Sequence, residues 1–226
     1  MTVSERADWE IAVGDAATVA VFEPATAERA GATFVCAHGA GGHMSDRGML
    51  AVTRSLREHG LDVVRFNFLY KQRKIGRPDP MPLLQKTVAA VVEHARSAAA
   101  PGRLIIGGRS MGGRAASMLA AEGFACDGLL LLAYPLHPEG QPDKLRDAHL
   151  PAITAPVLCL NGTRDALCRR DLMESVLHRV GPNWQMHWLD GADHSFHVLK
   201  SSGRTDADVL TEVGRAAASW LSCSVR

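Results

Sequence analysis

The chain has 226 residues, of which 46% are hydrophobic and 22% charged, and its 25 Lys and Arg nearly balance its 24 Asp and Glu. This composition is that of a globular protein and excludes a disordered chain, and the length predicts a single domain over residues 1–226. A net charge of +1 gives no field that would attract nucleic acid or an anionic membrane, so we expect neither as a partner.

The first residues lack the apolar core of a signal peptide, and the longest strongly apolar run, Leu129–Ala133, is too short to span a bilayer. We therefore expect a cytoplasmic protein. Five cysteines are an odd number, and Cys36 and Cys159 lie in apolar strand-like runs, where a free cysteine acts as a small buried hydrophobe. We expect reduced thiols rather than a disulfide framework.

Short runs of Val, Ile, Leu and Phe alternate with longer segments of helical periodicity, which is typical of a mostly parallel sheet covered by helices on both faces. A Gly-Asp turn at residues 14–15 predicts that the first two strands are an antiparallel pair. The predicted strands are Trp9–Val13, Thr18–Glu23, Thr33–Ala37, Leu61–Phe66, Leu104–Ile106, Leu129–Ala133, Val157–Leu160 and Gln185–Leu189. The predicted helices are Asp46–Glu58, Leu83–Ala98, Leu167–Val180 and Ala207–Leu221.

Two segments are predicted to be loops. The basic run from Lys71 to Arg77 is flanked by Gly and Pro and is expected to be a solvated surface rather than a phosphate track. The segment from Pro135 to Pro156 contains five prolines, so we expect mostly loop with one short helical piece at Lys144–His149. This segment is too short to form a cap domain.

Residues 108–112 read Gly-Arg-Ser-Met-Gly and fit the pattern G-x-S-x-G. The pattern marks a strained strand-to-helix turn that exposes a nucleophilic serine above a sheet. Its context fits, because a buried-strand pattern precedes it and residues 114–120 have a helical pattern. Taken alone the pattern is weak, since Gly-Ser clusters also end strands for structural reasons. Ser110 is the candidate nucleophile.

A serine hydroxyl needs a base within hydrogen-bond reach and a third group that orients the base. Asp165 follows the predicted strand Val157–Leu160, and His194 follows the predicted strand Gln185–Leu189. We therefore expect His194 to act as the general base and Asp165 to orient it, in the chain order serine, acid, histidine.

Each of these residues also has a simpler interpretation. Asp165 precedes a predicted helix and would serve equally as its N-cap, and His194 is one of ten histidines. Asp190 and Asp193 are competing acids, yet both are sequence neighbours of His194, whereas the acid of a triad comes from a separate loop. The joint occurrence of three matching placements favours the catalytic interpretation.

Residues 38–42 read His-Gly-Ala-Gly-Gly and follow the predicted strand Thr33–Ala37, where one donor of an oxyanion hole normally lies. We assign the backbone N–H of Ala40 as this donor and the backbone N–H of Met111 as the second. Because both donors are backbone groups, His38 is expected to be a structural histidine.

Other uses of these motifs fit less well. In a dinucleotide-binding fingerprint Met44 would occupy the place of the third glycine, and Asn67 rather than an acid ends the next strand. His194 and His197 have a spacing that metal sites use, but no helical cluster of further ligands accompanies them. We expect neither a cofactor nor a metal.

The chain resembles α/β-hydrolases of the dienelactone-hydrolase-like group. The elbow, Tyr134-Pro135-Leu136-His137-Pro138, Lys144-Leu145-Arg146, Pro156-Val157-Leu158 and Ala192-Asp193-His194-Ser195 resemble a branch that contains a testis-expressed hydrolase-like protein and a subunit of the non-specific-lethal chromatin complex. The resemblance extends from about Thr33 onward and implies the α/β-hydrolase fold without a cap domain.

The sequence therefore predicts a serine hydrolase that cleaves a carboxylic ester, thioester or lactone of a small substrate through an acyl-serine intermediate. Some members of the resembled branch act in complexes, so the alternative is a hydrolase-like interaction module with little or no catalytic activity. The intact triad argues against this alternative. The sequence assigns no role to Arg109 and Arg114, which flank the nucleophile, and it predicts no oligomeric state.

Overall fold

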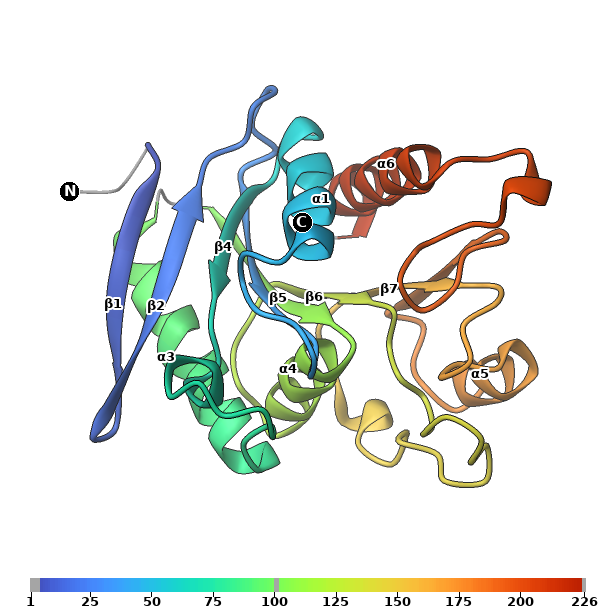
Figure 1. Cartoon of the computed structure of the whole chain (residues 1–226), viewed down its shortest axis with the longest axis horizontal. Helices are drawn as coiled ribbons and strands as arrows, with labels where there is room; N and C mark the ends of the chain where they lie inside the picture. The colour runs from blue at the N-terminus through green and yellow to red at the C-terminus, as the bar shows by residue number, and fades with distance from the viewer. Residues whose placement is uncertain (1–4, 100–101, 225–226) are drawn as a thin grey trace.

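A computed structural model of the chain describes residues 5–99 and 102–224. Its centre is an eight-stranded sheet in the order β1-β2-β4-β3-β5-β6-β7-β8 (Figure 1). β1 pairs antiparallel with β2 and β2 pairs antiparallel with β4, whereas the six strands β3 to β8 run parallel to one another. The strands are β1 Ala7–Val13, β2 Ala16–Glu23, β3 Ala32–Ala37, β4 Asp62–Phe66, β5 Arg103–Arg109, β6 Gly128–Leu132, β7 Val157–Gly162 and β8 Trp184–Leu189.

Helices cover both faces of this sheet. They are α1 Arg47–Glu58, α2 Leu69–Gln72, α3 Met81–Ala98, α4 Met111–Ala121, α5 Arg170–Leu177 and α6 Asp206–Ser224, with short 3-10 helices η1 Leu150–Ala152 and η2 Lys200–Ser202. α1 and α6 lie side by side on one face, while α3 and α4 lie on the other (Figure 1).

The central strands are buried on both faces, which explains their continuous hydrophobic runs. In β5, Ile106 faces the core beneath α3 and α4, whereas its neighbour Ile105 faces the core beneath α1 and α6. The same alternation places Leu131 of β6 in the first core and Leu132 in the second. This period of two fixes which strand-end residues point toward α1 and which toward α4.

All eight predicted strands and the antiparallel pair at the start are confirmed, with bounds that differ by a few residues. The prediction of a helical piece at Lys144–His149 is wrong, because backbone groups there bond to a distant segment. The N–H of Arg146 donates to the carbonyl of Leu136 at 2.7 Å, and the Tyr134 hydroxyl donates to the Arg146 carbonyl at 2.6 Å. The 3-10 helix η1 follows instead, starting at Leu150.

Two further boundaries differ from the predictions. The basic run is not all loop, since Lys71 and Gln72 belong to the short helix α2. The helix predicted over Leu167–Val180 begins only at Arg170. The N–H groups of Leu167 and Arg169 bond to the side chains of Asp165 and His137, and the backbone at Arg169 is still extended, with ψ 132°, so the helix begins only at the next residue.

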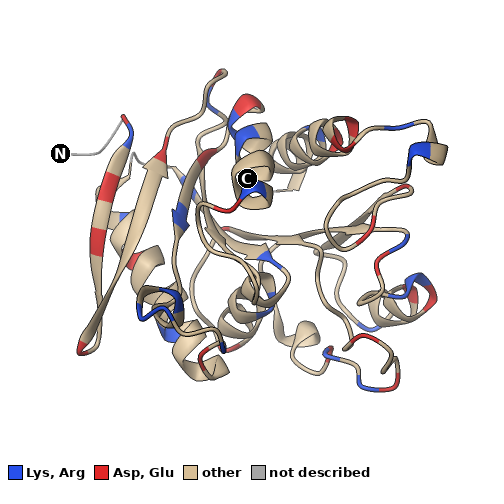
Figure 2. Ribbon diagram, viewed as in Figure 1, with Lys and Arg blue, Asp and Glu red and all other residues tan. Residues whose placement is uncertain are grey.

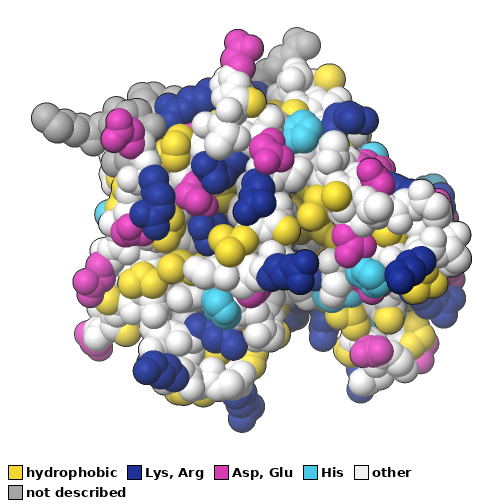
Figure 3. Space-filling view, turned by 45° about the horizontal axis from the view of Figure 1, so that its top comes forward, with side chains coloured by type: hydrophobic (Ala, Val, Ile, Leu, Met, Phe, Trp, Pro, Cys, Tyr) yellow, Lys and Arg dark blue, Asp and Glu magenta, His cyan; other side chains and the backbone are white. Residues whose placement is uncertain are grey.

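All five cysteines are free thiols, and Cys36 and Cys159 are buried as expected. Burial raises the pKa of the Cys36 thiol to about 12. Positive and negative side chains are intermixed along the ribbon and over the face seen in the space-filling view (Figures 2 and 3). Among the described residues, none of the helices has the length and apolar character that crossing a membrane requires.

Candidate active site

Ser110 lies at the turn between β5 and α4, with φ 51° and ψ −117°. A residue other than glycine is strained in this region, and such strain concentrates at functional sites. Glycines on both sides of Ser110 allow the turn to approach β3 closely. A Cβ on Gly108 would lie 2.1 Å from the carbonyl oxygen of Ala37, and one on Gly112 would lie 2.6 Å from the same atom. This close approach fixes the direction in which the Ser110 hydroxyl points.

The structure brings the three predicted site residues together. Oγ of Ser110 lies 2.9 Å from Nε2 of His194, and Nδ1 of His194 lies 2.9 Å from both carboxylate oxygens of Asp165. The Asp165 carboxylate is fully buried, whereas the His194 side chain is 27% exposed. With Nδ1–H donating to Asp165, Nε2 is free to accept the serine proton, as general-base activation of a serine requires.

Asp165 is held by two other donors. Its Oδ1 accepts from the N–H of Leu167 at 2.8 Å, and its Oδ2 accepts from Nδ2 of Asn161 at 3.1 Å. Asn161 is fully buried at the end of β7 and also pairs with the N–H and carbonyl of Tyr134, each at 3.0 Å. Asn161 was not predicted as a site residue, although a polar residue at the end of an apolar strand, four positions before Asp165, is a signal for such a role.

The simpler interpretation of Asp165 as a helix N-cap is wrong, because Arg169 occupies the N-cap position of α5. The competing acids have other partners. Oδ1 of Asp193 accepts from the N–H groups of Ser195 at 2.7 Å and His197 at 3.1 Å, and Asp190 lies 3.4 Å from the Thr163 hydroxyl. Asp193 therefore shapes the loop that carries His194.

The glycine loop after β3 runs directly beside the nucleophile, since a Cβ on Gly39 would lie 3.6 Å from Cβ of Ser110. The Tyr70 hydroxyl donates to the carbonyl of Ala40 at 2.7 Å and so orients the peptide units around it. Met111 is the first residue of α4, where a backbone N–H has no acceptor within the helix. The two predicted oxyanion donors thus belong to the two segments that flank Ser110.

His38, at the start of this loop, stabilises it through hydrogen bonds. It is fully buried, its Nε2 accepts from the N–H of Phe68 at 3.1 Å, and its Nδ1 lies 2.7 Å from the carbonyl of Gly39. Burial lowers the pKa of His38 to about 4, so the ring is neutral at pH 7 and Nδ1–H donates to that carbonyl. The prediction of a structural histidine agrees with these contacts.

Arg109 connects the nucleophile to the histidine loop. Its Nη2 donates to the carbonyl of His194 at 3.0 Å, and its guanidinium lies 5.9 Å from the ring centroid of Phe196, two residues further along. Its Nη1 leaves no room at Gly48 of α1, where a Cβ would approach it to 2.7 Å. Arg114 differs, because its buried Nε has no hydrogen-bond partner among the described residues, and we assign it no role.

A cavity of about 300 Å³ lies over this constellation. It is lined by Gly39, Ala40, Gly41, Gly42, Asp46, Arg109, Ser110 and His194. The wall on the side of the glycine loop carries no large side chain over the Ser110 hydroxyl, and the volume lies at the lower end of the range for small-molecule sites.

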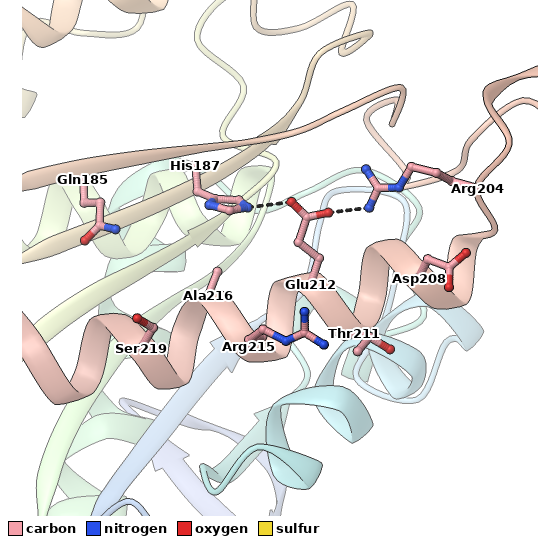
Figure 4. A pocket seen from close by; sticks show the side chains of 9 residues that line it. All are labelled: Gln185, His187, Arg204, Asp208, Thr211, Glu212, Arg215, Ala216 and Ser219. Carbon is pink, nitrogen blue, oxygen red and sulfur yellow. Dashed lines mark hydrogen bonds and ion pairs between the residues drawn. The ribbon is translucent and has the colours of Figure 1, made fainter.

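A larger hollow of about 600 Å³ lies elsewhere, between β8 and α6 (Figure 4). Glu212 accepts there from Nε2 of His187 at 2.8 Å and from the guanidinium of Arg204. Ser219 also lines this hollow, but His187 bonds to Glu212 rather than to that hydroxyl. The hollow therefore lacks the arrangement of nucleophile and base that surrounds Ser110.

A mostly parallel sheet with a strained serine at the turn after β5, and an acid and a histidine after β7 and β8, defines the α/β-hydrolase class. Residues 30–222 match the family model of the alpha/beta hydrolase domain, and the chain belongs to that family. The predicted α/β-hydrolase fold is thereby confirmed.

Solved structures share this fold over nearly their whole length. An alpha-beta serine hydrolase homologue from Coxiella burnetii has a TM-score of 0.75 at 20% identity, over 96% of this chain and 99% of that chain. An α/β serine hydrolase without lid from Xanthomonas campestris has a TM-score of 0.74 at 22% identity, over 97% of each chain. A dienelactone hydrolase from Anabaena variabilis has a TM-score of 0.73 at 19% identity, over 98% of this chain and 99% of that chain.

Proposed function

We propose that the chain is a serine hydrolase that cleaves a carboxylic ester, thioester or lactone of a small substrate through an acyl-Ser110 intermediate. One observation carries the proposal: Oγ of Ser110 and Nε2 of His194 are 2.9 Å apart, and Asp165 lies 2.9 Å from the other ring nitrogen. A strained serine, a base in contact with it and a buried acid behind the base are what acyl transfer needs.

The proposed reaction proceeds in two halves. His194 takes the Ser110 proton through Nε2 as Oγ attacks the carbonyl carbon, and the electron pair moves to the carbonyl oxygen. The N–H groups of Ala40 and Met111 stabilise this oxyanion, each worth on the order of 3 kcal/mol in the transition state. The leaving group then departs with the proton from His194. In the second half His194 deprotonates water as the water oxygen attacks the acyl carbon. When the bond between Oγ of Ser110 and the acyl carbon breaks, His194 returns this proton to Oγ and the acid is released.

Asp165 remains ionised throughout and stabilises the imidazolium of His194. The steps are balanced by the protein side chains, backbone donors and water, so the proposed reaction uses no cofactor. We further propose that residues 1–226 act as one domain, and that the chain lies in the α/β-hydrolase branch with the testis-expressed and non-specific-lethal relatives.

The substrate is proposed to be small. The cavity over Ser110 has a volume of about 300 Å³, at the lower end of the range for small-molecule sites. A structural neighbour from Xanthomonas campestris is described as a serine hydrolase without lid, and another as a dienelactone hydrolase. A site of this size without a cap favours a short acyl group that is reached from the surface.

The test is hydrolysis of p-nitrophenyl esters of increasing acyl length by the purified full-length protein. We expect kcat/KM to be highest for acetate or butyrate and to fall with longer chains, and Ser110→Ala to abolish turnover. Chelation by EDTA should leave the rate unchanged. A steady rise of kcat/KM out to long chains would overturn the small-substrate proposal, and loss with EDTA that zinc restores would overturn the metal-free mechanism.

A further inference from the structure

A second cavity lies behind the histidine loop, between α1 and α6. Its volume is about 370 Å³, and Arg109 lines both this cavity and the one over Ser110. A hydrogen bond joins the two helices near this cavity, where the Ser55 hydroxyl of α1 donates to the carbonyl of Leu210 in α6 at 2.6 Å. The size is within the range of sites that hold small molecules.

Two arginines bring positive charge to this cavity without a direct ion pair among the described residues, although His197 and, at longer range, Arg47 lower the pKa of Asp206 in the same wall. Arg47 and Arg109 both line it, and neither lies within ion-pair distance of a carboxylate of the described residues. The acid in its wall is Asp206. Both oxygens of Asp206 lie 3.0 Å from Nδ1 of His197, and Oδ1 also accepts from the N–H of Val198 at 2.9 Å.

A second acid, Asp46, also has hydrogen-bond partners of its own. Asp46 lines the neighbouring cavity over Ser110, and as the N-cap of α1 it accepts from the N–H of Met49 at 2.8 Å and from the N–H of His43 at 3.0 Å. Arg47 and Arg109 therefore form a pair of cations with hydrogen-bond donors available to a ligand. Arginine is the residue best suited to bind a carboxylate, because its planar donors match the two oxygens.

Apolar side chains form much of the remaining wall, while Gly48, Ser195 and His197 complete it. The apolar residues are Ala51, Val52, Leu132, Phe196 and Leu210. Phe196 has φ 62°, a strained value that turns its ring beneath the Arg109 guanidinium. A ligand that fits this lining has an apolar or aromatic body and a single anionic end.

We propose that this cavity is a binding site for a small organic carboxylate, with its carboxylate between Arg47 and Arg109 and its apolar body against Phe196 and Leu210. Binding here is distinct from the chemistry at Ser110, yet it touches the same machinery. Arg109 holds the carbonyl of His194, so an anion that engages Arg109 acts directly on the segment that positions the base.

The test is direct binding of benzoate to full-length Ser110→Ala protein by isothermal titration calorimetry, with neutral benzamide as the matched probe. We expect benzoate to bind and benzamide to bind at least about tenfold more weakly, because the charge-assisted hydrogen bonds are lost. Arg47→Gln should weaken benzoate binding by a similar factor. Arg54→Gln removes another exposed arginine of α1 that does not line the cavity, so it should leave binding unchanged.

A second variant tests the location. Leu210→Trp should fill the cavity and abolish benzoate binding, while circular dichroism and the melting temperature show that the protein remains folded. No benzoate binding by the folded parent protein, or equal binding by Arg47→Gln and Arg54→Gln, would overturn the proposal. Since Ser110→Ala lacks the proposed nucleophile, this result is independent of whether the protein is an esterase.

The carboxylate belongs either to a free acid or to the substrate ester, and kinetics of the wild-type protein separate the two. Benzoate that raises only KM for p-nitrophenyl acetate shares space with the substrate, which supports a carboxylate on the ester. Benzoate that changes kcat acts as a separate ligand through Arg109 and His194. Saturating benzoate that changes neither parameter, in an enzyme shown to bind it, would refute the contact with the catalytic segment.

Discussion

Replacing Asp165 by Asn exchanges one carboxylate oxygen for an amide nitrogen. The change removes an acceptor from a buried donor, and it removes the acid that orients His194. In the protein Oδ1 accepts from the N–H of Leu167 at 2.8 Å, Oδ2 accepts from Nδ2 of Asn161 at 3.1 Å, and both oxygens lie 2.9 Å from Nδ1 of His194. The amide nitrogen of Asn has to occupy one of these two oxygen positions. In either place it faces a donor, so one buried N–H loses its acceptor.

The expected magnitudes follow from these contacts. A buried donor without an acceptor costs about 1–3 kcal/mol, so Asp165→Asn should lower the free energy of unfolding by that amount. The amide also favours the wrong tautomer of His194, for which a loss of about 10⁴ in kcat is the precedent in serine proteases. Both effects should appear together, whereas loss of a mere turn-forming residue would change stability alone.

The assay is hydrolysis of p-nitrophenyl acetate combined with urea unfolding, and Asp190→Asn and Asp193→Asn serve as controls. Asp193 accepts two backbone N–H groups through Oδ1, which the carbonyl of Asn can replace. Both controls should therefore retain kcat within about tenfold. Near-normal kcat in Asp165→Asn, or a similar loss in all three variants, would refute the role of Asp165.

Two further predictions concern the supports of the site. His38 has a pKa of about 4 when folded and about 6.5 when unfolded, so the unfolded chain gains the proton first and stability falls from pH 6.5 to pH 4, by about 3 kcal/mol. His38→Asn should reduce this slope in urea midpoints measured across that range, while His149, whose pKa burial also lowers to about 4, keeps its own contribution; an unchanged slope would contradict the prediction. Arg109→Met should lower kcat more than it raises KM, because the bond to the His194 carbonyl is lost. Added guanidinium should restore part of the rate, and normal kcat would contradict the positioning role.

The sheet was predictable because its central strands are buried on both faces and so read as unbroken apolar runs. The run Leu129–Ala133 is an example, since its residues from Leu129 to Leu132 alternate between two cores. The segment from 144 to 149 was mispredicted, because its backbone bonds to Leu136 and Tyr134 outweigh its local helical tendency. Such long-range partners leave no periodic trace in the sequence.

The positions of Ser110, Asp165 and His194 were predictable because each follows the carboxyl end of a parallel strand, and such ends meet at one edge of a sheet. The glycines around Ser110 mark where backbones touch. Asn161 and Arg109 were not predictable in the same way. Their roles depend on contacts with Tyr134 and with the His194 carbonyl, which only the folded chain brings within reach.

The most direct measurement of the proposed mechanism is covalent labelling with a fluorophosphonate, followed by peptide mapping of the modified residue. We expect a single adduct on Ser110, and Ser110→Ala should lose it while keeping the circular dichroism spectrum and melting temperature of the parent. An adduct on another residue, or none in the properly folded protein, would contradict a serine hydrolase and favour a hydrolase-like interaction module.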